Sequence, residues 1–156
     1  MMIARWLMVL GLLGATAAGL SSCPSDEEET PSACLSKSSA YLAALTAAPG
    51  EVLLEEQVRI SDCLTPDQGG GELAGVGEEM IAAATELNAE ARQDPGGDAA
   101  VQLGYLVGAV ERGQEGIHAD LVRRLNAAAR FGPDGLLPPE FERTFGRGYA
   151  AGLESG

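Results

Sequence analysis

The chain has 156 residues, of which 46% are hydrophobic and 21% are charged, and its mean hydropathy is near zero. This balance excludes a wholly disordered chain and a protein with many membrane-spanning helices. Aromatic residues make up only 4%, so a core must rely on Ala, Leu, Val and Gly. The formal charge of −13 argues against nucleic-acid binding, which depends on Lys and Arg, and against adsorption to anionic headgroups.

Residues 1–22 have the pattern of a secretory signal peptide. One cation, Arg5, precedes an apolar run over residues 6–20, which is shorter than the roughly 20 residues of a membrane-spanning helix. The run ends in Leu20-Ser21-Ser22-Cys23, which resembles the lipobox of bacterial lipoproteins. The resemblance implies cleavage before Cys23, acyl chains on that residue, and export to a bacterial cell membrane or outer membrane. It covers only the signal and its cleavage site.

The number of cysteines favours lipidation over ordinary secretion with cleavage near Ala15-Thr16-Ala17. The chain has three cysteines, so ordinary secretion would leave one of them unpaired. If Cys23 carries lipid, Cys34 and Cys63 remain as one disulfide pair, and an exported compartment permits their oxidation. A redox-active pair is the alternative, but the chain offers neither C-x-x-C spacing nor a nearby cation cluster.

Residues 23–33 are predicted to form the lipidated start and a disordered tether. The run over residues 25–32 is acidic, contains a proline and is nearly free of apolar groups, so it cannot build a core. Ten extended residues reach at most about 35 Å. The folded domain is therefore expected over residues 34–156.

This domain is predicted to be all-α, a small bundle of about five to six short helices. Glycine and proline separate six segments of helical length, at residues 35–47, 51–63, 73–91, 98–112, 117–131 and from 139 onward. We expect an N-terminal hairpin of the first two segments, packed on a four-helix core. Such a hairpin would bring Cys34 and Cys63 together. The second segment is ambiguous between helix and strand, because Val58-Arg59-Ile60 alternates like a strand.

The third, fourth and sixth segments carry the strongest patterns. The third repeats apolar residues at steps of three and four, which places them on one helical face: Leu73, Val76, Met80, Ala84, Leu87 and Ala91. The fourth begins at Asp98, a candidate N-cap, and is apolar on nearly all sides, so we expect it at the centre. Glycine pairs spaced four apart, 104 with 108 and 148 with 152, predict close packing of the fourth and sixth helices.

Few residues offer site chemistry. Tyr105, His118 and Tyr149 could line a groove between bundle helices for a small ligand or a metal, but plain packing is the favoured interpretation of the two tyrosines. His118, the one histidine, is otherwise a partly exposed capping or packing residue. A weaker alternative is a hydrolytic enzyme with His118 as general base. No triad pattern, second Glu-x-x-His unit or phosphate-loop lysine occurs, so no catalytic residue, metal or cofactor is predicted.

The charges are unevenly distributed along the chain. Residues 23–100 hold sixteen acids and three bases, whereas residues 101–156 hold seven acids and six bases. We expect the arginines at 123, 124, 130, 143 and 147 to pair with acids of the first half, inside the fold or at its surface; an anionic partner is the alternative. The leading hypothesis is a non-enzymatic envelope lipoprotein whose helical domain binds a partner or supports an assembly.

Overall fold

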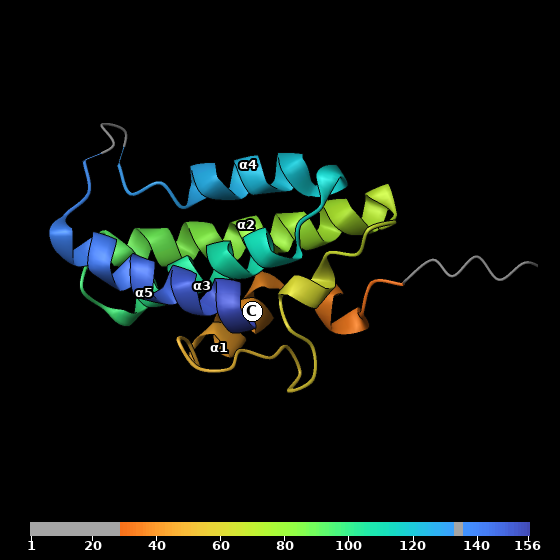
Figure 1. Ribbon diagram of the computed structural model, residues 1–156, viewed down its shortest axis with the longest axis horizontal. Helices are drawn as coiled ribbons and strands as arrows, with labels where there is room; N and C mark the ends of the chain where they lie inside the picture. The colour runs from red at the N-terminus through yellow and green to blue at the C-terminus, as the bar shows by residue number, and fades with distance from the viewer. Residues whose placement is uncertain (1–28, 133–135) are drawn as a thin grey trace, which may run out of the picture.

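A computed structural model describes residues 29–132 and 136–156. These residues form five α-helices: α1 (Ser38–Leu45), α2 (Gly70–Ala91), α3 (Asp98–Gly113), α4 (Ala119–Ala128) and α5 (Pro139–Ser155). Three short 3-10 turns join them: η1 (Ser32–Leu35), η2 (Ser61–Cys63) and η3 (Gly116–His118). α3 packs against α2 and α5, α4 packs on α2, and α1 packs on α2 and α3 (Figure 1). The predicted all-α bundle is confirmed.

α2 and α3 confirm the clearest sequence patterns. On α2, Val76, Met80, Ala84 and Ala91 are fully buried, because the repeat of three and four turns them all toward the core. Ten of the 16 residues of α3 are buried, and the helix is central as expected. Its N-cap position is held by Gly97 rather than by Asp98, whose side chain caps nothing.

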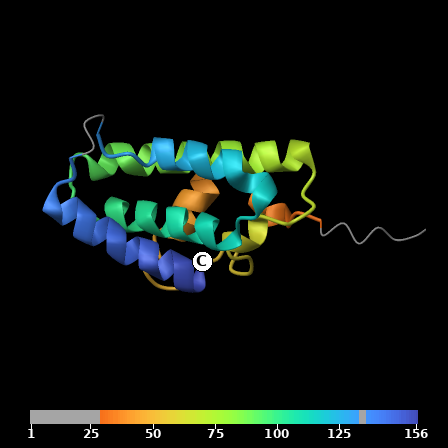
Figure 2. The same ribbon diagram turned by 45° about the horizontal axis from the view of Figure 1, so that its top comes forward.

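The two glycine pairs form the interface between α3 and α5, which run side by side (Figure 2). A Cβ atom added to Gly104 would overlap the carbonyl oxygen of Phe145, and one added to Gly148 would overlap that of Val101. Gly108 and Gly152 lie in the same way against the backbone of the facing helix. The predicted close packing of these two helices is confirmed, and only glycine fits at the four contact positions.

Residues 51–63, which the sequence left ambiguous between helix and strand, form neither a regular helix nor a strand along their length. The chain is instead largely irregular there, with one isolated bridge in which Leu54 and Val58 exchange two backbone hydrogen bonds of 2.8 and 3.1 Å. Glu55 and Glu56 reverse the chain with φ angles of 49° and 61°. Val52 and Leu54, two residues apart, are both buried. In an extended chain, residues two apart point to the same side, so both can face the core, whereas in a helix they could not. The burial of these two side chains offsets the unfavourable φ angles of Glu55 and Glu56.

The N-terminal hairpin of two helices is therefore replaced by one helix, α1, and an irregular segment. The first helix is also shorter than predicted, because the backbone at Ser36 is extended. Leu35, the first residue of the predicted first segment, is 50% exposed. Glu79 of α2 caps α1: its carboxylate accepts a hydrogen bond of 2.7 Å from the amide of Ser38. This hydrogen bond is the largest of the effects that lower the pKa of Glu79.

The last two helices follow the predicted segments with shorter bounds. In α4, Leu121 and Leu125 are buried, whereas Ile117, the first residue of the predicted fifth segment, lies in the preceding turn η3 and is 48% exposed. α5 begins at a proline, as predicted, and buries Phe141 and Gly152. Within the two described stretches, no helix has the length and hydropathy needed to cross a membrane.

The glycine interface makes a stability prediction for α5. Gly148→Ala should lower the free energy of unfolding by about 1–3 kcal/mol, because the methyl group meets backbone that cannot move without separating the helices. Gly146→Ala, on the same helix with nothing within 4 Å, should raise it by up to about 1 kcal/mol. Urea unfolding followed by circular dichroism measures both. Equal effects of the two substitutions would contradict the packing described here.

Candidate functional site

Cys34 and Cys63 form a disulfide, as predicted. Both residues are fully buried, and their Cα atoms lie 5.4 Å apart although 29 positions separate them in the sequence. Tyr41 packs beside them and donates a hydrogen bond of 2.7 Å to the carbonyl oxygen of Cys34. Burial, together with the charge of Glu79, raises the pKa of Tyr41 well above its usual range. The disulfide joins η1 to η2 and holds the irregular segment against the core.

This disulfide should contribute measurably to stability. Replacing both cysteines by serine should lower the free energy of unfolding by about 2–4 kcal/mol, because the unfolded chain loses the constraint of a closed loop. Denaturant titration of the two proteins gives the difference. Mass mapping without reductant should find one cross-linked peptide, and two free thiols in the folded protein would contradict the assignment.

The two candidate tyrosines lie at the glycine interface, but their hydroxyl groups are engaged separately. Tyr105 of α3 is fully buried, and its hydroxyl lies 3.3 Å from the Ser155 hydroxyl. Tyr149 of α5 is half-buried, and its hydroxyl donates to the Glu111 carboxylate. That hydrogen bond is the main cause of the raised pKa of Tyr149. Both hydroxyls therefore already have partners within the fold.

His118 is fully buried in η3, so its expected partial exposure is wrong, whereas its capping role is confirmed. Its Nδ1 atom accepts a hydrogen bond of 2.9 Å from the amide of Glu115, so the neutral ring carries its proton on Nε2. Nε2 has no partner of hydrogen-bond geometry among the described residues. Burial lowers the pKa of His118, against smaller opposing effects of the Thr65 backbone and the Glu115 carboxylate.

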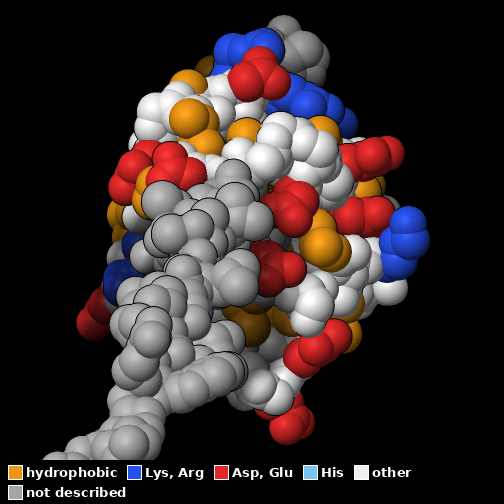
Figure 3. All heavy atoms as spheres, turned by 90° about the vertical axis from the view of Figure 1, so that its right-hand side faces the viewer, with side chains coloured by type: hydrophobic (Ala, Val, Ile, Leu, Met, Phe, Trp, Pro, Cys, Tyr) orange, Lys and Arg blue, Asp and Glu red, His pale blue; other side chains and the backbone are white. Residues whose placement is uncertain are grey.

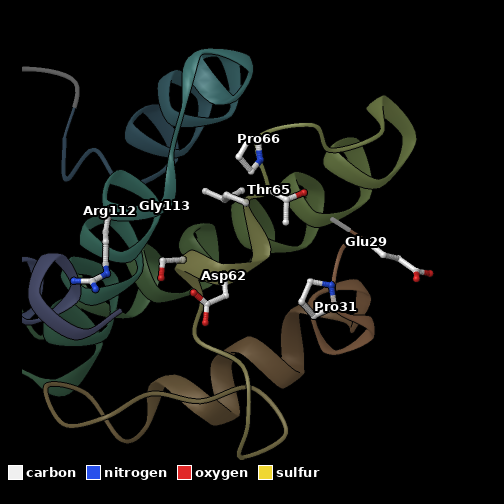
Figure 4. A pocket seen from close by; sticks show the side chains of 9 residues that line it. Glu29, Pro31, Asp62, Thr65, Pro66, Arg112 and Gly113 are labelled. Atoms are coloured by element: carbon white, nitrogen blue, oxygen red, sulfur yellow. The ribbon is translucent and has the colours of Figure 1, made fainter. Parts of the chain in front are cut away.

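One hollow has a volume of about 630 Å³ and opens between η2, the end of α3 and the start of the described chain. Figure 4 shows Glu29 and Arg112 at its opposite ends, with the Glu29 carboxylate directed away. Arg112 is occupied, since it donates to the carbonyl oxygens of Leu153 and Glu154. The hollow is lined by both polar and apolar residues: Glu29, Pro31, Ser61, Asp62, Leu64, Thr65, Pro66, Arg112 and Gly113.

Three buried polar atoms, on Thr65 and on two residues near it, lack hydrogen-bond partners among the described residues: Thr65 Oγ1, Gln68 Oε1 and His118 Nε2. Gln68 is otherwise fixed, because its amide nitrogen donates to Thr30 Oγ1 at 2.8 Å and to the carbonyl oxygen of Cys63 at 3.0 Å. None of the three atoms is exposed to the large hollow. These three atoms are therefore not available to a ligand placed in this hollow.

A second hollow, of about 300 Å³, lies between the end of α4 and the first half of α5. We call it the phenylalanine groove, and it is lined by Asn126, Ala129, Arg130, Phe131, Leu137, Phe141 and Phe145. The ring centres of Phe131 and Phe141 are 4.5 Å apart, and those of Phe141 and Phe145 are 5.4 Å apart. Tyr149 continues the row at 6.3 Å from Phe145.

Sequence reasoning missed this groove and placed a ligand groove elsewhere. Tyr105, His118 and Tyr149 line neither of these two hollows, nor a third one beside Arg143 and Arg147. A signal for the phenylalanine groove was present, because all three phenylalanines of the chain fall within residues 131–145.

The arginines of the second half are less paired than expected. Among the described residues, the ion pairs are Lys37 with Glu79 and Arg123 with Asp120. Arg124, Arg130, Arg143 and Arg147 therefore have no described acid at ion-pair distance. Figure 3 shows several acidic side chains over one end of the molecule; basic side chains gather at its top, where α4 lies, with an acidic side chain among them.

The described residues include no group of three or more His, Cys, Asp or Glu placed to hold a metal ion. Comparison with protein-family models, with curated proteins and with solved structures found no match.

The buried histidine predicts a specific pH dependence. The pKa of His118 is lower in the folded than in the unfolded protein, so its contribution to stability is complete above the unfolded value of about 6.5 and is lost as the pH falls toward the folded value. The loss from one proton is at most about 1.4 kcal/mol per pH unit.

His118→Asn keeps an acceptor for the Glu115 amide but does not titrate. The free energy of unfolding should therefore fall less in this variant than in the parent between pH 7.5 and pH 5.5. Urea titrations at the two pH values give both differences, and carboxylates shared by the two proteins cancel. An equal fall in both proteins would show that His118 is not held in its neutral form.

Proposed function

We propose that the protein is a lipid-anchored lipoprotein of the bacterial cell envelope that acts as a non-enzymatic binding module. The observation that carries the anchoring is the lipobox-like Leu20-Ser21-Ser22-Cys23 after a short apolar run. The disulfide supports it, because pairing of Cys34 with Cys63 leaves Cys23 as the remaining cysteine of the three. In an exported protein, a cysteine that is left without a disulfide partner is expected to have another role, and lipidation is such a role.

Acyl chains at Cys23 would provide the anchor. Each buried methylene contributes about 0.8 kcal/mol, and two chains give stable attachment where one gives only marginal binding. The acidic residues that follow Cys23 would then be repelled by anionic headgroups, which favours a body held off the membrane surface.

The shape of the domain fits a binding role at a distance from the anchor. The described chain starts at one end of the long axis, and α5 begins at the other end (Figure 1). The phenylalanine groove is lined by residues at and near the start of α5. A partner could therefore reach the groove while the N-terminal end is tied to a bilayer.

Cys23→Ser tests the anchor. The parent should be found in the membrane fraction and carry radiolabelled fatty acid, whereas the variant should lose the label and leave that fraction. The control is the double variant Cys34→Ser, Cys63→Ser, which should keep both label and membrane association. Membrane retention of unlabelled Cys23→Ser protein would show that another feature holds the chain there.

A further inference from the structure

We propose that the phenylalanine groove docks an acidic, amphipathic helical segment of a partner protein, which inserts large apolar side chains between α4 and α5. This inference rests on the proposed role as a binding module and names its surface and the chemistry of its partner.

The first support is the exposure of apolar side chains at the groove. Phe131 and Phe145 are only half-buried, Leu137 is 46% exposed, and the adjacent Leu136 is 83% exposed. The chain contains three phenylalanines in all, and the groove holds all of them. Aromatic and aliphatic side chains gathered in one exposed patch are typical of a protein-binding surface.

The second support is the concave shape of the patch. α4 packs mainly on α2, whereas α5 packs along α3, so the two helices leave a hollow of about 300 Å³ between them. The lining of the hollow is predominantly apolar and includes Phe141 and Phe145. Such a space accepts one or two large side chains of a helix laid along it, in the manner of a helix-in-groove complex. A flat lipid surface would leave it unfilled.

The third support is the sign of the charge at the rim. Arg130 follows the end of α4 and is exposed, and among the described residues no acid lies at ion-pair distance from it. Arg130 lines the groove, and the guanidinium of Arg92 donates a hydrogen bond of 2.9 Å to the Arg130 carbonyl oxygen. No acidic side chain is among the lining residues.

This rim contrasts with the rest of the chain. The sequence from Cys23 onward carries 23 acids against nine bases, a charge of −14. A local basic edge in so acidic a protein favours an acidic partner segment, because opposite charges attract across an interface and like charges repel.

The experiment selects partners for the full-length lipidated protein in phosphatidylcholine nanodiscs. A display library of 16-residue peptides, randomised without charge bias, is panned on the parent protein. The selected peptides should have a net negative charge and apolar residues at steps of three and four. Their affinity should fall at least tenfold for Leu137→Ser. Arg130→Glu should shift the selection toward basic peptides.

Leu35→Ser is the matched control, because Leu35 is an exposed leucine on η1, away from the groove. It should bind the selected peptides like the parent. Circular dichroism confirms that the three variants fold. Selected peptides without an acidic bias, or with equal affinity for the serine variants at 35 and 137, would overturn the proposal.

Two further outcomes would assign the groove to another occupant and so contradict it. One is binding to phosphatidylglycerol vesicles that Leu137→Ser abolishes; the other is a dimer in sedimentation that the same change dissociates. Failure of the proposed anchoring is seen separately, in the membrane fractionation of Cys23→Ser. The groove proposal can therefore be contradicted while the anchoring proposal holds, and the anchoring proposal can be contradicted while the groove proposal holds.

Discussion

The contact between the backbones of α3 and α5 is the constraint on which the rest of the fold depends. Four glycines remove the side chains that would hold these helices apart, so that a Cβ at Gly104 or Gly148 would overlap a carbonyl oxygen of the facing helix. Glycine inside a helix costs about 1 kcal/mol relative to alanine. Dispersion and the burial of α3 on all sides offset that cost. The centre of the bundle thus needs few aromatic residues.

This contact also determines where the phenylalanines lie. With the glycine face of α5 fixed on α3, Phe141 and Phe145 turn toward the end of α4, where Phe131 meets them. They form a row at the edge of the bundle, and part of it stays exposed. The disulfide and Tyr41 stabilise the opposite, N-terminal side of the fold. The stiff centre therefore separates the side where the chain enters from the side where we place the partner.

Sequence patterns predicted the helices whose burial follows a regular period. The repeat in α2 and the two glycine pairs were read correctly because each depends on positions within one helix. The segment over residues 51–63 was misread, since no glycine marks the reversal at Glu55 and Glu56 and the burial of Val52 and Leu54 overrides local preference. His118 was placed too near the surface, because its burial comes from segments distant in sequence. The groove combines residues of two helices and their link, so no single periodicity reveals it.

The most direct test of the central contact is a nuclear Overhauser measurement on the folded full-length protein. Protons on the Cα of Gly104 should show strong cross-peaks to the amide proton of Tyr149, and those of Gly148 to the amide proton of Tyr105. Such cross-peaks require the two backbones to touch, as the glycine positions indicate. Their absence, with cross-peaks only between side chains of the two helices, would mean that α3 and α5 lie at an ordinary helix separation and would contradict the account.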